Sequence, residues 1–323
     1  VSSRRITVPA GADTVIRRED TDDGRSIVSI LQDRDVRKNI RRKGEDFHAG
    51  DSLFEAGEEL TVAHVGALAS AGIKSVAVHR KPKVALISSG DELVELDDFD
   101  QSLAGRKIVS SNSVTLSALV RECGGEPVDL GIALDDRDSL RRKLEQARDV
   151  DLILTSAGLS VGDHDHVRDV IGDIGGSIDF WKVRMRPGAP LAFGEIHGIP
   201  WIGMSGNPVS AIVTFEVFVR AAIRRMLGHQ RLFAPTIAVR IGNAMKLGAP
   251  LMHFLRIVVS KNENGENVAN LAGSQSSSVL TSLARANALL ILPGDKLEIE
   301  EGEVHRALPI GSRLFTTDRL VLT

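Results

Sequence analysis

Val84-Ala-Leu-Ile-Ser-Ser-Gly-Asp-Glu-Leu93 is an apolar run typical of a buried strand, followed directly by a polar loop. From about residue 79 onward, strand and helix patterns alternate along the chain. This alternation predicts a mostly parallel sheet covered by helices on both faces. Ligands of such sheets bind at the carboxyl ends of the strands, so the loops that follow strands are where a site is expected.

The spacing of apolar residues predicts the elements around this first strand. Further strands are expected at residues 127–132, 151–155, 178–183, 191–194 and 201–203. Helices are expected at residues 112–123, 138–147, 165–174 and 208–227. Together they predict an α/β domain over residues 79–229.

The flanking parts of the chain have other patterns. Residues 1–23 resemble the end of a β-rich domain, and 24–78 predict an elongated, strand-rich connector with a short capped helix after Thr61. Residues 230–323 predict a small, barrel-like all-β domain with one short helix. Its expected strands are 236–241, 254–260, 289–292 and 297–299, and its expected helix is 279–286.

Composition excludes several classes of protein. The 323 residues suggest two or more domains, at roughly 150 residues each. Forty Lys and Arg against 43 Asp and Glu are interspersed along the chain, which argues against a nucleic-acid partner. The single cysteine, Cys123, excludes a disulfide framework and fits the cytoplasm. No apolar run reaches the roughly 18 residues of a membrane helix, so no membrane partner is expected.

Three loops after predicted strands are rich in glycine, serine and acids: 88–93, 156–165 and 203–210. In the third, Pro208 suits the first turn of a helix, and Gly206 and Asn207 could present backbone N–H groups to an anion such as phosphate. The alternative is an ordinary turn with a capping asparagine.

Six acids fall at the same edge of a parallel sheet, which favours a Mg²⁺ site beside the phosphate. They are Asp91, Glu92, Asp135, Asp136, Asp163 and Asp165. For each acid alone, the alternative is a helix cap or a solvated loop position.

Three further patterns have competing interpretations. Lys182, Arg184 and Arg186 would share one face of a strand, either to bind a polyanion or to protect an edge strand. Gly158-Leu-Ser-Val-Gly162 fits a hydrolase nucleophile motif around Ser160, but no helix begins at that serine. His164 and His166 lack a third zinc ligand nearby, so a polar loop is favoured.

Taken together, the loops resemble those of the molybdopterin molybdenumtransferase family, the MoeA and gephyrin E-domain proteins. The shared motifs are Ser-Gly-Asp-Glu-Leu (89–93), Gly-Leu-Ser-Val-Gly-Asp-His-Asp (158–165), Arg-Pro-Gly-Ala-Pro (186–190) and Gly-Asn-Pro-Val-Ser (206–210). The resemblance extends over essentially the whole chain. It implies insertion of molybdate into adenylylated molybdopterin with release of AMP, with Mg²⁺ assisting.

The resemblance also implies roles for individual residues. Catalytic acids would be Glu92, Asp135, Asp165 and Asp20, of which the first three would bind the metal. Pterin or phosphate would be bound by Ser89, Gly90, Asp91, Gly158, Ser160, Gly162, Asp163, Lys182, Arg186, Pro187, Pro190, Gly206, Asn207 and Ser210.

The chain departs from the family pattern at several positions. Ser110, Ala157, Ala189 and Ser205 stand where the family commonly has Asp, Gly, Lys and Pro. The family's Asp-Gly-Tyr-Ala segment would lie before residue 1. In the family it reaches the partner's site across a dimer, so a homodimer with a composite site is implied, as are contacts with other cofactor-biosynthesis proteins or molybdoenzymes. The alternatives are a pterin-binding scaffold without catalysis and a serine hydrolase that uses Ser160.

Overall fold

The computed structural model describes residues 8–105, 107–158 and 166–311. The chain separates into two units, Val1–Glu58 and Glu59–Thr323, which are described one at a time. Within the described part, no helix is long and apolar enough to cross a membrane.

Ion pairs organise the first unit. After the short helix η1 (Arg18–Asp20), the Asp20 carboxylate accepts a hydrogen bond of 2.7 Å from Arg34, and Asp35 accepts one of 2.8 Å from Arg17. Both carboxyl groups are buried, and their arginine partners hold the pKa of each below its ordinary value. Asp20, predicted as a catalytic acid, is therefore engaged in an internal ion pair of this unit.

The strand-rich character predicted for residues 24–78 is wrong. The described residues of this stretch form no strand, and their one β pairing is an isolated bridge between Thr21 and Ile30. Apolar residues that suggested strands remain exposed, with Ile27 at 81% and Leu31 at 64%. Without a neighbouring sheet to cover them, they gain nothing by forming strands.

The second unit begins with the predicted capped helix. Helix α1 (Val62–Ser70) starts after Thr61, whose side chain and backbone both bond to the turn that contains His64. None of its residues is buried. The capping signal was therefore sufficient to locate the helix, although Val62 and Val65 of its apolar residues are exposed.

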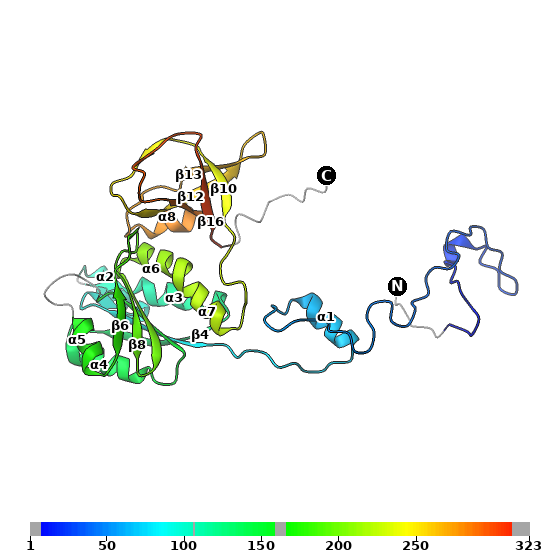
Figure 1. Cartoon of the computed structure of the whole chain (residues 1–323), viewed down its shortest axis with the longest axis horizontal. Coiled ribbons are helices and arrows are strands. Elements are labelled where there is room, and N and C mark those ends of the chain that lie inside the picture. The colour runs from blue at the N-terminus through cyan, green and yellow to red at the C-terminus, as the bar shows by residue number, and fades with distance from the viewer. Residues whose placement is uncertain (1–7, 106, 159–165, 312–323) are drawn as a thin grey trace. The chain divides into compact units, whose positions relative to one another are not determined.

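A six-stranded sheet forms the centre of the α/β domain and confirms the predicted fold class (Figure 1). The four strands β4, β1, β5 and β9 are mutually parallel, while β8 and β6 are antiparallel additions. The order across the sheet is β4 (Glu126–Ala133), β1 (Lys83–Ser89), β5 (Leu152–Ser156), β9 (Ile199–Met204), β8 (Leu191–Ile196) and β6 (Ser177–Trp181). The carboxyl ends of the four parallel strands therefore lie at the same edge of the sheet.

Helices cover both faces of this sheet (Figure 1). Ala85 and Ile87 of β1 pack against α4 (Arg137–Gln146) and α5 (His166–Asp173), whereas Val84 and Leu86 pack on the opposite face. Burial on both faces explains why the strand reads as an uninterrupted apolar run rather than an alternating one. The opposite face is covered by α3 (Ser111–Glu122) and by the segment that begins with α6 (Pro208–Thr214).

The long predicted helix contains an unexpected turn. Helix α6 continues through one π-helical turn, η3 (Phe215–Val219), into α7 (Arg220–Met226).

A second, very small sheet follows β1 in the chain: β2 (Leu93–Val94) pairs in parallel with β3 (Ile108–Val109). Between them lie η2 (Leu96–Asp98) and α2 (Phe99–Leu103).

The strand predicted over residues 178–183 ends early. Strand β6 stops at Trp181 because Lys182 has a φ of +88°, which breaks the extended backbone. The next strand, β7 (Met185–Arg186), pairs with the C-terminal domain. The prediction that Lys182, Arg184 and Arg186 share one strand face is therefore wrong.

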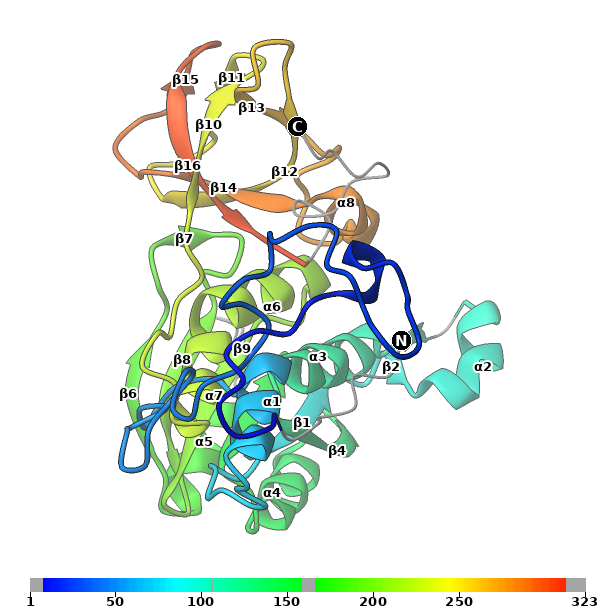
Figure 2. The same cartoon turned by 90° about the vertical axis from the view of Figure 1, so that its right-hand side faces the viewer.

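The C-terminal part forms a closed barrel, shown in Figure 2. Its strands run in the order β13, β10, β16, β14 and β12, and an additional pairing of β12 with β13 closes the ring. The bounds are β10 (Ile237–Ile241), β12 (Met252–Lys261), β13 (Asn267–Leu271), β14 (Ala288–Leu292) and β16 (Val304–Pro309), with α8 (Leu280–Arg285) beside them. The short strands β11 (Met245–Lys246) and β15 (Glu298–Ile299) pair separately.

Candidate active site

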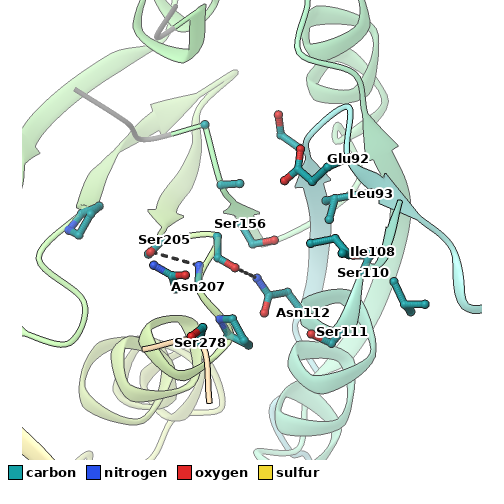
Figure 3. Close-up of a pocket in the computed structure, with 17 residues that line it drawn as sticks. Glu92, Leu93, Ile108, Ser110, Ser111, Asn112, Ser156, Ser205, Asn207 and Ser278 are labelled. Carbon is teal, nitrogen blue, oxygen red and sulfur yellow. Dashed lines mark hydrogen bonds between the residues drawn. The ribbon is translucent and has the colours of Figure 1, made fainter. Parts of the chain in front are cut away.

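A cavity of about 680 Å³ lies at the carboxyl ends of β1, β5 and β9. Its polar lining includes six serines, Ser89, Ser110, Ser111, Ser156, Ser205 and Ser278. Glu92 supplies the carboxylate, and no described lining residue is lysine, arginine or histidine. The cavity is therefore rich in neutral hydrogen-bonding groups (Figure 3).

The loop after β1 brings together four of the predicted site residues. Ser89 donates a hydrogen bond of 3.2 Å to Asp135, which also accepts one of 3.3 Å from the Asp91 backbone. The Asp91 carboxylate accepts in return from the backbone N–H of Asp135, at 3.0 Å. These bonds fix the loops after β1 and β4 to each other, while Glu92 remains at the cavity.

A glycine is needed beside Glu92. A Cβ atom at Gly90 would lie 2.6 Å from a Glu92 carboxylate oxygen, and Gly90 has a φ of +149°. Any larger residue would displace the carboxylate from its present position.

Asp136, one of the six acids predicted at this edge of the sheet, is a helix cap, as the alternative interpretation expected. It is the N-cap of α4, and its side chain accepts a hydrogen bond of 2.7 Å from the backbone N–H of Ser139. A capping aspartate of this kind stabilises the helix start. It does not line the cavity within the described part of the chain.

A row of hydroxyl groups crosses the floor of the site. Ser110 donates to Ser88 at 3.0 Å, and Ser88 lies 3.3 Å from the Ser156 hydroxyl at the end of β5. All three residues are buried. The loop continues through Ala157 and Gly158, both of which line the cavity. Four predicted residues of this loop, Ser160, Gly162, Asp163 and Asp165, lie outside the described residues.

The loop after β9 offers fewer free donors than predicted. The N–H of Asn207 donates to the Ser205 hydroxyl at 3.3 Å, and the N–H of Val209 donates to the Ser277 carbonyl at 3.2 Å. Pro208 has no N–H. Of the two backbone donors predicted for the anion site, Gly206 and Asn207, the N–H of Asn207 is therefore already engaged, although both residues line the cavity.

The remaining predicted residues are divided between the cavity and other places. Pro190 lines the cavity, whereas Lys182, Arg186, Pro187 and Ser210 do not. Arg186 is exposed and belongs to the strand that pairs with the barrel. Pro187 and Ser210 are buried. Roles for these four residues in ligand binding stay predictions.

Three polar lining residues were missed by sequence reasoning. Ser111 and Asn112 enter from the start of α3, and Ser278 comes from the segment before α8 (Figure 3). The one sequence signal for Asn112 was its position at the start of the helix predicted over residues 112–123. Nothing local marks Ser278, because its place depends on contact between the barrel and α6.

The described carboxylates supply part of what a magnesium site requires. No group of three Asp, Glu, His or Cys residues in the described ranges could hold a metal. Mg²⁺, however, is usually held by one or two carboxylates together with substrate phosphates. Glu92 and Asp135, which adjoin one loop, suit that arrangement, and Asp165 lies outside the described residues.

Comparisons with known proteins agree along the chain. Residues 85–225 match a family described as a probable molybdopterin binding domain. Residues 6–72 match the MoeA N-terminal region (domains I and II), and residues 238–310 match the MoeA C-terminal region (domain IV). The cavity therefore lies largely within the stretch that matches the molybdopterin-binding family.

Curated relatives share the same name. The chain is 33% identical to the molybdopterin molybdenumtransferase of Nostoc sp. over 92% of this chain and 68% of that protein. It is 35% identical to molybdopterin molybdenumtransferase 2 of Mycobacterium tuberculosis, over 91% and 73%. The chain belongs to the molybdopterin molybdenumtransferase family. As a member of that family it is a transferase of molybdenum cofactor biosynthesis.

A solved structure supports the fold of the chain. The molybdopterin biosynthesis MoeA protein of Pyrococcus horikoshii superposes with a TM-score of 0.72 at 28% identity. The alignment covers 93% of this chain and 72% of that one.

Two neighbouring residues of the site give a matched test of backbone conformation. Ala157 and Gly158 have φ values of +78° and +73°, a region that glycine adopts readily and alanine does not. We expect Ala157→Gly to raise the free energy of unfolding by about 1 kcal/mol, because the left-handed conformation then costs less. Gly158→Ala should lower it by about 2 kcal/mol, since its Cβ would lie 2.7 Å from Val167. Denaturant unfolding of both variants measures the difference, and a loss of stability in Ala157→Gly would contradict the left-handed conformation.

Proposed function

We propose that the cavity binds adenylylated molybdopterin and that this chain inserts molybdate into its dithiolene with release of AMP, in a reaction that requires Mg²⁺. The observation that carries the proposal is the position of the cavity, at three parallel strand ends in the stretch that matches a probable molybdopterin binding domain. Its volume of about 680 Å³ is in the range of small-molecule sites.

Neutral groups of the chain would bind and orient the substrate. The serine hydroxyls can donate to phosphate oxygens or accept from pterin N–H groups. Glu92 would bind the metal ion, and Asp135, which accepts hydrogen bonds from Ser89 and the Asp91 backbone, would be the second carboxylate. When bound, Mg²⁺ would neutralise phosphate charge and polarise the phosphoanhydride bond.

The test is AMP release by the purified protein supplied with adenylylated molybdopterin. We expect release to require both molybdate and Mg²⁺ and to stop when a chelator removes the metal. Tight pterin binding without AMP release under any of these conditions would contradict the proposal and support a scaffold role. Labelling of Ser160 by a fluorophosphonate probe would instead support a serine hydrolase.

We also propose that the functional form is a homodimer with a composite site. Several apolar side chains of the first unit are exposed, among them Ile27, Ile30 and Leu31, at 81%, 60% and 64%. Apolar residues gathered in this way commonly mark a protein–protein interface. A second copy of the chain would remove them from water, as it would Val62 of α1, which is 92% exposed.

The dimer is tested by its mass in solution. Wild-type protein should sediment at twice the 34.8 kDa of one chain. Replacing Ile27 and Leu31 by Glu places charge on the apolar surface and should shift the equilibrium to the monomer. The control is Arg41→Glu, an exposed charge change in the same unit that should leave the dimer intact. A wild-type protein that is monomeric at micromolar concentration contradicts the proposal.

A further inference from the structure

The peptide between Gly206 and Asn207 is held at both ends by buried side chains. Its carbonyl oxygen accepts a hydrogen bond of 2.9 Å from Asn112 Nδ2, and its N–H donates to the Ser205 hydroxyl at 3.3 Å. Asn112 and Ser205 are only 8% and 7% exposed. Because a peptide group is planar, fixing both ends fixes its rotation about the chain.

Asn112 makes this contact across the cavity from a distant part of the sequence. It lies in the first turn of α3, 94 residues before Gly206, and Figure 3 shows its side chain reaching from that helix to the loop after β9. On its other side the loop touches the chain after β5, since a Cβ at Gly206 would lie 2.9 Å from the Ala157 Cβ. The loop is thus confined between two elements of the site.

The orientation of this peptide matters for an anionic ligand. The Gly206 carbonyl carries partial negative charge in a cavity that has no described basic lining residue. The Asn112 amide donates to that carbonyl and so reduces its repulsion of phosphate oxygens. No other hydrogen bond to the Gly206 carbonyl is formed in the described part of the chain.

We propose that Asn112 is a positioning residue for substrate binding: by holding the Gly206–Asn207 peptide and donating to its carbonyl, it keeps that carbonyl from repelling the phosphate groups of a pterin nucleotide. The proposal rests on the proposed function, because it takes the cavity to be the substrate site. Asn112 acts through the loop and is not assigned contact with the reacting atoms.

The test compares Asn112→Asp with wild-type protein. The variant keeps the shape of the side chain but places a carboxylate oxygen where the amide donor stood, so it repels the Gly206 carbonyl. We expect the KM for adenylylated molybdopterin to rise about tenfold or more while kcat changes less than about threefold. The dissociation constant of the pterin nucleotide, followed by pterin fluorescence, should rise by the same factor.

The matched control is Asn267→Asp. Asn267 donates from Nδ2 to the Ala238 carbonyl at 3.2 Å in the barrel, so the same chemical change is made away from the cavity. It should leave KM and kcat unchanged. If Asn112→Asp does not fold, Asn112→Ala removes the donor without adding charge and should raise the dissociation constant in the same direction.

The outcomes separate this inference from the proposed function. Unchanged KM and unchanged nucleotide affinity in both Asn112 variants would overturn the positioning role while the wild-type reaction stands. A wild-type protein that binds the nucleotide but releases no AMP would overturn the proposed reaction, and the affinity measurement would still decide the role of Asn112. A wild-type protein that does not bind the nucleotide overturns both.

Discussion

Glu92→Gln is expected to lower the rate of molybdate-dependent AMP release by about 100-fold or more, with the fold unchanged. Among the described lining residues, Glu92 is the one with a carboxylate, and Gly90 leaves the space that this carboxylate occupies. Glutamine has the same shape but no charge. It would therefore test the proposed metal ligand without altering the size of the cavity.

The loss of activity should depend on metal concentration. If Glu92 binds Mg²⁺, the variant should need more Mg²⁺ for half of its maximal rate, while its affinity for the pterin nucleotide measured without metal should be close to wild type. AMP release measured over a Mg²⁺ titration gives both quantities. A variant with wild-type rate at every concentration would remove Glu92 from the proposed mechanism.

Asp136→Asn is the matched control for this experiment. Asp136 also lies in a loop at the carboxyl end of a parallel strand, β4, but it is the N-cap of α4. Asparagine is as good an N-cap as aspartate, so the variant removes one negative charge from the same edge without breaking the helix start. It should keep both wild-type activity and wild-type stability. A similar loss of activity in both variants would indicate a general effect of charge at this edge.

The elements that sequence predicted well are those whose signal is local. The apolar run at residues 84–87 and the helix over residues 112–123 were confirmed as β1 and α3, to within a few residues. Burial on both faces makes such strands read as apolar without interruption, and this pattern does not depend on knowing the neighbours. The capped helix after Thr61 was found for the same reason.

The errors arose where structure depends on distant partners. The connector was predicted to contain strands from its apolar triplets, but Ile27 and its neighbours join no sheet among the described residues of the first unit. Strand β13 was missed because its five residues owe their conformation to pairing with β10 and β12. β-propensity reflects such packing more than any intrinsic preference of the backbone.

The site was predicted in the same uneven way. Ser89, Glu92, Gly158, Pro190, Gly206 and Asn207 line the cavity, and their roles in binding or catalysis stay predictions. Asn112 and Ser278 could not be found from spacing, since one crosses the cavity from another helix and the other comes from the barrel. The segment containing Ser278 is itself held by Arg256 of β12, which donates to the carbonyls of Ser274 and Ser276.

Arg256→Met should lower the free energy of unfolding by about 2–4 kcal/mol. Arg256 is fully buried in β12, and burial lowers the pKa of its guanidinium group. The guanidinium donates to the carbonyls of Ser274 and Ser276, each at 3.0 Å, and to the Ser282 hydroxyl at 3.3 Å. Methionine fills much of the same space but leaves these acceptors without their donor.

The control for this variant is Arg240→Met. Arg240 belongs to the same barrel and donates to the Gly302 carbonyl and to Glu266, but its side chain is 42% exposed. Water can replace those bonds, so we expect little change in stability. Thermal unfolding should therefore separate the two variants by about 5–10 °C.

The consequence of Arg256→Met should extend to the site. Arg256 binds two carbonyls of the segment that ends at Ser278, and the next carbonyl, of Ser277, accepts the N–H of Val209 at the start of α6. Loosening that segment should withdraw Ser278 from the cavity and weaken pterin-nucleotide binding, even at temperatures where the variant is folded. Nucleotide affinity measured well below the melting temperature tests this link. Wild-type affinity in a destabilised variant would show that Arg256 supports the barrel alone.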